Sequence, residues 1–160
     1  MIGRGIAFRP IVRGDFELLA QWLSAEHVRV WWHDAADTAS IEQKYGPRVD
    51  GLDTSEVFVI ELDAQPIGLI QRYRFDDNPS WQATLAVAGT PGDACGIDYL
   101  IGQQQLIGCG LGPELIQLFS LETWERYPDV QAIVVDVQQG NRRSWRALEM
   151  EVDKEAGQRS

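Results

Sequence analysis

The chain has 160 residues, of which 14 are basic and 24 acidic, so its net charge is −10 with both histidines neutral. This length favours one domain, and 44% apolar residues are typical of a folded globular protein rather than a disordered one. The negative balance argues against nucleic acid as a partner, because phosphate binding needs a basic face, and it is compatible with a cationic ligand.

The first half of the chain predicts two helices and three strands. Apolar residues recur at helical spacing after Asp15, and Thr38 is a candidate helix cap. The polar stretch 26–37 between the helices predicts no element of its own. We expect, in chain order, a strand over 6–12, a helix from Phe16, a short helix from Thr38, and strands over 57–62 and 67–75 joined by a turn over 63–66.

The second half alternates strands and helices. We expect a strand over 94–101, a glycine-rich connection over 102–112, a helix with Pro113 in its first turn, a strand over 132–137 and a helix over 141–150. The whole order is β, α, α, β, β, β, α, β, α. It predicts an α+β fold in one domain over 1–150, with a mixed central β-sheet flanked by helices, followed by a polar tail over 151–160.

Two cysteines are too few for a disulfide framework or a zinc ribbon, and the two histidines have no metal-ligand company, so we expect no metal. The first residues lack the apolar stretch of a signal peptide, and no apolar run approaches the roughly 20 residues that span a bilayer. We therefore expect a cytoplasmic protein that has no membrane partner.

The most informative stretch is Gln105-Leu106-Ile107-Gly108-Cys109-Gly110-Leu111-Gly112, between a predicted strand and a predicted helix. Closely spaced glycines let backbone N–H groups converge on an anion, and the positive end of the next helix points at the same place. Pro113 excludes a P-loop, which would continue with Lys and Ser or Thr. The stretch predicts a phosphate or pyrophosphate site, although the glycines could also serve a tight strand–helix turn.

The pattern Gln105-x-x-Gly108-x-Gly110 resembles the acyl-coenzyme A pyrophosphate loop of the GNAT N-acetyltransferase superfamily, and the predicted element order is also similar. The resemblance implies acetyl-coenzyme A (acetyl-CoA) as co-substrate. It implies cofactor contacts from the loop, from the strand before it and from an asparagine after the next strand, which here are Gln105, Gly108, Cys109, Gly110, Leu111 and Gly112; Tyr99, Leu100 and Ile101; and Asn141.

Further motifs are similar to those of the aminoglycoside 6′-N-acetyltransferases, namely Trp31-Trp32, Gln71-x-Tyr73, Gly96-Ile97-Asp98 and Asp136. This resemblance implies transfer of an acetyl group to the 6′-amine of an aminoglycoside, a small polycation. Asp98 and Asp136 would bind its ammonium groups and Trp32 and Tyr45 would wall the sugar site, with Gln71 and Tyr73 as further substrate-binding candidates. Simpler roles remain open, such as a solvated strand edge for Asp98, a strand-end cap for Asp136 and a packed strand face for Gln71 and Tyr73.

Asp98 is also the candidate general base. An ammonium group must lose a proton before it can attack a thioester, and a nearby carboxylate can accept that proton directly or through water. Backbone N–H groups of the same strand would hold the oxyanion.

Two features depart from the family. Leu148 stands where many members have a tyrosine, and the polar residues 151–160 replace two expected strands, so the C-terminal strands are missing or altered. The edge left unpaired could be covered in a homodimer. Two rival functions remain, an acyltransferase for a hydroxylysine-type siderophore precursor and a non-catalytic acyl-CoA binding module.

Overall fold

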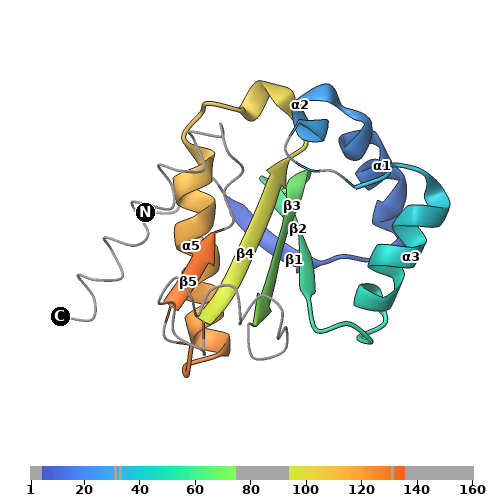
Figure 1. Ribbon diagram of the computed structural model, residues 1–160. Helices are drawn as coiled ribbons and strands as arrows, with labels where there is room; N and C mark the ends of the chain where they lie inside the picture. The colour runs from blue at the N-terminus through green and yellow to red at the C-terminus, as the bar shows by residue number, and fades with distance from the viewer. Residues whose placement is uncertain (1–4, 31, 33, 75–93, 131, 136–160) are drawn as a thin grey trace. The chain divides into compact units, whose positions relative to one another are not determined.

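The computed structural model describes residues 5–30, 32, 34–74, 94–130 and 132–135 (Figure 1). The strands among these residues form one five-stranded sheet in the order β1-β2-β3-β4-β5. The chain divides into two compact units, the first made of 1–71 and 99–107 and the second of 72–98 and 108–160. Strands β3 (Gln65–Arg74) and β4 (Ala94–Ile101) each contribute residues to both units.

The first unit begins with an antiparallel pair of strands. Strand β1 (Ile6–Pro10) pairs with β2 (Glu56–Leu62), from Ile6 opposite Leu62 to Pro10 opposite Phe58. Asp63 and Ala64 connect β2 to β3 at φ 50° and 70°. Two such residues make the tight hairpin turn whose twist matches that of the strands. The predicted turn over 63–66 was therefore too long, and β3 already begins at Gln65.

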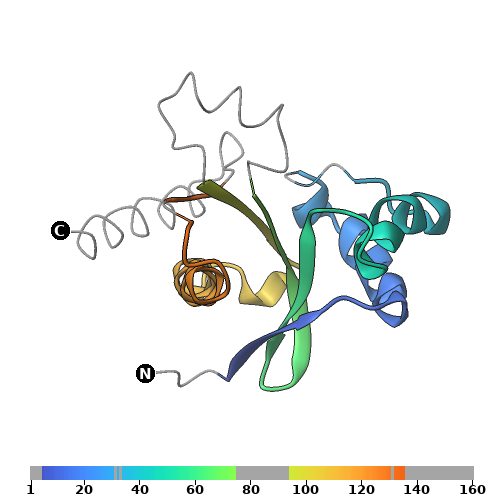
Figure 2. The same cartoon turned by 90° about the horizontal axis from the view of Figure 1, so that it is seen from below.

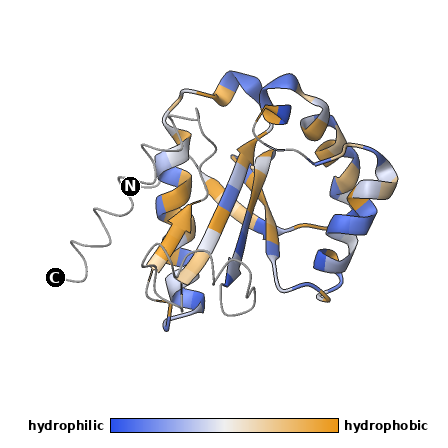
Figure 3. Ribbon diagram, in the orientation of Figure 1, coloured by the Kyte–Doolittle hydropathy of each residue, from blue (hydrophilic) through white to orange (hydrophobic). Residues whose placement is uncertain are grey.

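Three helices follow β1 in this unit. They are α1 (Phe16–Ser24), preceded by the single 3-10 turn η1 (Arg13–Asp15), α2 (Glu26–Arg29) and α3 (Thr38–Val49). In both views α1 and α3 lie on the same side of β2 (Figures 1 and 2). Figure 3 shows that α1 and α3 carry both hydrophobic and hydrophilic residues, as expected of helices with one buried face.

Two details of these helices differ from the sequence-based expectation. The cap of α3 is Asp37 rather than Thr38, because the Asp37 carboxylate accepts a hydrogen bond from the Ser40 N–H at 3.0 Å. The stretch 26–37, expected to hold no element, contains α2. Its one turn is secured by Val28, which is 2% exposed.

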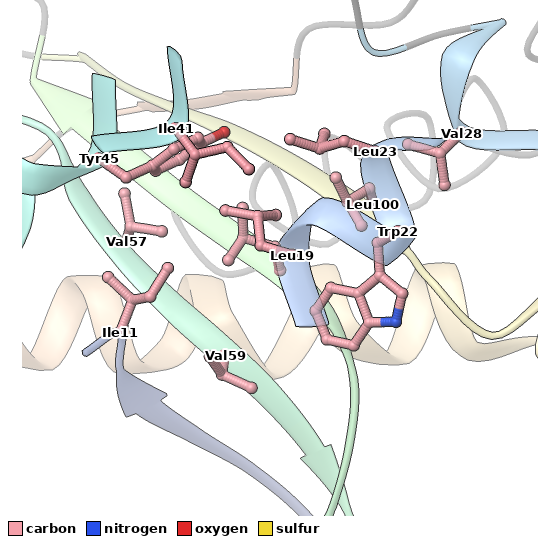
Figure 4. Packing of buried hydrophobic residues seen from close by; sticks show 11 residues of the cluster. Ile11, Leu19, Trp22, Leu23, Val28, Ile41, Tyr45, Val57, Val59 and Leu100 are labelled. Atoms are coloured by element: carbon pink, nitrogen blue, oxygen red, sulfur yellow. The ribbon is translucent and has the colours of Figure 1, made fainter. Parts of the chain in front are cut away.

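The core of the first unit lies between these helices and the strands. Figure 4 shows Leu19 and Leu23 of α1 near Ile41 and Tyr45 of α3, with Val57 of β2 below Tyr45. The buried cluster consists of Ile11, Leu19, Trp22, Leu23, Val28, Ile41, Tyr45, Val57, Val59, Leu69 and Leu100.

In the second unit the first half of β4 pairs in parallel with β5 (Ala132–Val135), from Ala94 opposite Ala132 to Ile97 opposite Val135. Helix α5 (Leu111–Arg126) begins earlier than the sequence suggested. Gly112 is therefore the second residue of the helix and not the end of the connection. Pro113, as predicted, lies in the first turn, where its missing N–H costs nothing. No helix among the described residues is long and apolar enough to cross a membrane.

Candidate active site

The glycine-rich loop joins β4 to α5 through the 3-10 turn η3 (Gln104–Leu106). Gly108 and Gly110 have φ 87° and 79°, in the left-handed region that side chains disfavour. Gly110 is the residue before α5, and a Cβ built on it would have nothing within 4 Å. The start of this 16-residue helix thus carries a partial positive charge, with open space beside Gly110. The local geometry is that of an anion-binding helix N-terminus.

The loop residues predicted to bind the cofactor are exposed before the helix, whereas within the helix Gly112 is half-buried and Leu111 is buried. Gln105, Gly108, Cys109 and Gly110 are exposed, whereas Leu111 is 2% exposed and anchors the first turn of α5. The amide nitrogen of Gln105 lies 3.4 Å from the side-chain oxygen of Gln103. The exposed part of the loop can therefore be reached by a ligand.

The end of β4, predicted to bind the pantetheine arm, is held at its main chain. The Nε2–H of His27 donates to the Ile101 carbonyl at 3.0 Å. The Gly102 N–H donates to the Ile67 carbonyl at 2.7 Å. Leu100 is 6% exposed and packs in the core of the first unit, while Tyr99 and Ile101 are half-buried. The Ile101 carbonyl therefore already has a protein partner.

Asp98, the candidate base, is half-buried in β4 within the second unit. Its neighbour Ile97 is fully buried, so strand alternation places Asp98 on the opposite face, together with Gly96. The ring of Tyr73 covers Gly96, since a Cβ there would lie 2.4 Å from Tyr73 Cε2. The structure thus puts Tyr73, which is 8% exposed, over the face of β4 that carries Asp98.

Trp32 and Tyr45, predicted as walls of the sugar site, meet at one carboxylate in the first unit. Asp34 Oδ2 accepts hydrogen bonds from Trp32 Nε1 at 2.8 Å and from the Tyr45 hydroxyl at 2.7 Å. Both Asp34 oxygens lie 2.6 Å from the Lys44 ammonium. Trp32 is half-buried, whereas Tyr45 is fully buried. Tyr45 is therefore covered by protein in this structure, and its role as a wall of the sugar site stays a prediction.

The charges of this cluster follow from burial and hydrogen bonding. Burial raises the pKa of Asp34, but hydrogen bonds from Lys44 and Tyr45 and the Lys44 charge together lower the pKa below its usual value. Burial and the negative charge of Asp34 raise the pKa of Tyr45. Asp34 is thus an anion at neutral pH, and Tyr45 is a neutral hydroxyl that donates to it.

Gln71 lies close to the same cluster but is 6% exposed. Its side-chain oxygen accepts a hydrogen bond from Arg48 Nη1 at 2.8 Å, and the Arg48 guanidinium lies 5.5 Å from the Tyr45 ring centroid. The alternative of a packed strand position describes Gln71 better than an open binding position does.

Other predicted site residues lie outside the described part of the chain. These are Trp31, Asp136 and Asn141, as well as Leu148 and the tail 151–160. Within the described ranges, no group of three His, Cys, Asp or Glu side chains could hold a metal ion.

Sequence reasoning missed three polar residues that organise these regions. The sequence pattern only places Asp34 in a polar stretch and Arg72 in a strand. It indicates no metal-ligand company for His27 and suggests no other role for it. The signal for Asp34 was weak. It was an acid between Trp32 and a helix that carries adjacent Lys and Tyr, and only the fold brings these side chains together.

Comparisons with known proteins show the family and the fold of this chain. The model of a family described as acetyltransferase (GNAT) domain matches residues 12–157. The aminoglycoside N(6′)-acetyltransferase type 1 of Klebsiella pneumoniae is 27% identical over 148 residues, which are 90% of this chain and 71% of that protein. A structure of AAC(6′)-Ib with paromomycin and acetyl-CoA matches with a TM-score of 0.76 and 27% identity, over 91% of this chain and 80% of that one. A structure of AAC(6′)-Ib with coenzyme A and kanamycin matches with a TM-score of 0.74 and 26% identity, over 90% of this chain and 81% of that one.

Proposed function

The chain belongs to the GNAT acetyltransferase family, and we propose that it transfers the acetyl group of acetyl-CoA to the 6′-amine of an aminoglycoside. The observation that carries this proposal is the similarity, over 91% of the chain, to a structure that holds both an aminoglycoside and acetyl-CoA. The net charge of −10 supports a small cationic acceptor, because charge-assisted contacts to carboxylates are among the stronger polar interactions.

We assign the pyrophosphate of acetyl-CoA to the exposed loop around Gly108 and Gly110, where the α5 N-terminus favours negative charge. The pantetheine arm follows the end of β4, from Tyr99 to Ile101. Asn141, which the structure does not describe, remains a proposed contact by the family resemblance.

In the proposed reaction, Asp98 accepts a proton from the acceptor ammonium, directly or through a water molecule. The neutral amine then attacks the thioester carbonyl carbon, so that a C–N bond forms and the carbonyl oxygen becomes an oxyanion. Backbone N–H groups of β4 stabilise this charge. The C–S bond breaks as the carbonyl reforms, and the attacking nitrogen releases its second proton to solvent, which leaves a neutral amide. The thiolate takes a proton from solvent, since its thiol pKa is near 8.5.

The test is thiol release from acetyl-CoA by the purified chain, with a panel of kanamycin-type drugs, hydroxylysine and simple polyamines. We expect rapid release with a drug that bears a 6′-amine and none with its 6′-hydroxyl counterpart. Preferred turnover of hydroxylysine would contradict the proposal and favour the siderophore-precursor reaction. Binding of acetyl-CoA without release across the panel would favour the non-catalytic module.

A further inference from the structure

The carboxylate of Asp34 is the meeting point of three donors in the first unit. Its oxygens accept from Trp32 Nε1 at 2.8 Å, from the Tyr45 hydroxyl at 2.7 Å and from Lys44 Nζ at 2.6 Å. Lys44 and Tyr45 are neighbours on α3, while Trp32 and Asp34 precede that helix. The carboxylate therefore ties Trp32 to α3.

Trp32 is restrained in three ways. Its backbone N–H donates to the Val28 carbonyl at 2.8 Å, its ring packs against the core of the first unit, and its indole N–H is bound by Asp34. The side chain is nevertheless only half-buried. The indole is thus fixed, and its one polar atom is already satisfied inside the protein.

We infer that Asp34 is a positioning residue for the acceptor site, which holds the Trp32 indole so that its ring face, and not its N–H, meets the acceptor. This inference rests on the proposed acetyl transfer to an aminoglycoside. Asp34 acts through Trp32, because Lys44 already neutralises its charge and Tyr45 and Trp32 occupy Oδ2.

The geometry restricts the acceptor chemistry that Trp32 recognises. A tryptophan face attracts cations and the apolar face of a sugar ring, whereas only its N–H would attract a hydrogen-bond acceptor. Because Asp34 occupies that N–H, the part of the acceptor on Trp32 is an ammonium group or the C–H face of a ring. An anionic substituent at this place would be disfavoured.

Three variants separate positioning from direct charge recognition. Asp34→Ala removes the acceptor for the indole N–H, and we expect the KM for kanamycin to rise about tenfold while the KM for acetyl-CoA stays unchanged. Asp34→Asn keeps a carbonyl oxygen for the indole and should have a much smaller effect. In a Trp32→Phe background, which keeps an aromatic face but lacks the N–H, Asp34→Ala should change the KM little further.

The matched control is Asp15→Ala. Asp15 is a carboxylate of the same unit with similar exposure, 13% against 19% for Asp34, and it is paired with Arg9 as Asp34 is with Lys44. A general loosening of the unit would raise the kanamycin KM in both alanine variants, whereas positioning raises it only for Asp34→Ala.

A readout that needs no acceptor keeps this inference separate from the proposed function. The indole N–H resonance of Trp32, assigned by its loss in Trp32→Phe, should shift and exchange faster with solvent in Asp34→Ala than in Asp15→Ala. An unchanged resonance would overturn the inference. The inference would be overturned in favour of direct ammonium binding if Asp34→Ala raised the KM for kanamycin equally in the unmodified and in the Trp32→Phe background. It would also be overturned if Asp34→Asn and Asp34→Ala raised that KM equally. Absence of thiol release from the unmodified chain with every aminoglycoside would instead contradict the proposed function.

Discussion

Asp98 is the residue on which the proposed chemistry depends most. It follows the fully buried Ile97 in β4 and shares a face with Gly96, against which Tyr73 packs. A half-buried carboxylate on a fixed strand is well suited to take a proton at a defined position, because the rigid backbone holds it in place.

Asp98→Asn preserves the size of this side chain but removes its ability to accept a proton. We expect kcat for a 6′-amine aminoglycoside to fall about 10²- to 10⁴-fold, as for loss of a general base. This fall in kcat is measured as the rate of thiol release at saturating concentrations of both substrates. Asp129→Asn removes an exposed acid of the same unit, paired with Arg74, and should leave kcat unchanged. An unaltered kcat in Asp98→Asn would place the base elsewhere.

Tyr45 illustrates how one residue can be important for a reason other than the expected one. The family resemblance implies a sugar wall, whereas in the structure the side chain is fully buried and its hydroxyl donates to Asp34. The Tyr45 hydroxyl therefore helps to hold the Asp34 carboxylate in place.

At the scale of elements, β3 and β4 approach closely in the first unit because Gly68 has no side chain. A Cβ there would lie 2.2 Å from the Leu100 carbonyl oxygen, which is backbone and cannot rotate away. This approach lies next to the part of β4 assigned to the pantetheine arm.

Gly68→Ala should therefore separate the two strands. We expect a loss of about 1–3 kcal/mol in the free energy of unfolding and a higher KM for acetyl-CoA. Urea denaturation and thiol-release kinetics measure the two effects. Gly14→Ala is the matched control, since its Cβ would meet only Val12 Cγ2, at 3.9 Å. Equal stability of the two variants would contradict the close approach.

In the second unit, Arg72 of β3 connects the strand to α5. It is 2% exposed, forms an ion pair with Glu122, donates to Thr123 Oγ1 at 3.0 Å and lies 5.2 Å from the ring centroids of Phe119 and Tyr127. A buried arginine is stable only when its charge is paired and its donors are used. This pairing helps to hold α5, whose first residues form the predicted phosphate site.

Arg72→Met removes the ion pair, the hydrogen bond and the ring contacts together. Because the Glu122 side chain is 42% exposed, no buried charge is left behind, and we expect the free energy of unfolding to fall by about 1–2 kcal/mol through the lost hydrogen bonds and ring contacts. Arg126→Met is the control, because Arg126 also lies over the Tyr127 ring, at 5.7 Å, but is exposed. Its effect should stay within about 0.5 kcal/mol. Urea denaturation of both variants measures the two changes in the free energy of unfolding. Similar losses in Arg72→Met and Arg126→Met would contradict the stabilising role of the Arg72 contacts.

At the scale of the whole molecule, paired carboxylates link stability to pH. Burial raises the pKa of Asp15, but hydrogen bonds from Arg9 and the Val12 N–H lower it further than burial raises it. The pKa of Asp34 is also lowered on balance. A folded-state pKa below the unfolded value means that the stability gain is complete above the unfolded pKa and is lost as pH falls through the folded pKa.

We therefore expect these two residues to contribute fully at pH 5–7 and progressively less below about pH 4, near the unfolded pKa of Asp. Urea midpoints measured from pH 2 to 7 check this. Asp34→Asn should be less stable than the unmodified chain at pH 7, and the difference should shrink in acid. A constant difference across the range would contradict the linkage.

The expected homodimer belongs to this scale as well and stays a prediction. It rests on the family's two further strands, which residues 151–160 do not resemble. Size-exclusion light scattering on the purified chain checks it, and a monomer would contradict it.

The sequence by itself determined the order of the five described strands with α1, α3 and α5, the strand over 94–101, the glycine-rich loop and the family. These are local properties, since the spacing of apolar residues and the φ preference of glycine act within a few positions. Only the tertiary structure decided that Asp34 holds Trp32, that Tyr45 is buried and that Arg72 pairs with Glu122. Asp34 is 11 positions from Tyr45 and Arg72 is 50 from Glu122. Their partners depend on how helices and strands pack, and no local pattern in the sequence encodes that.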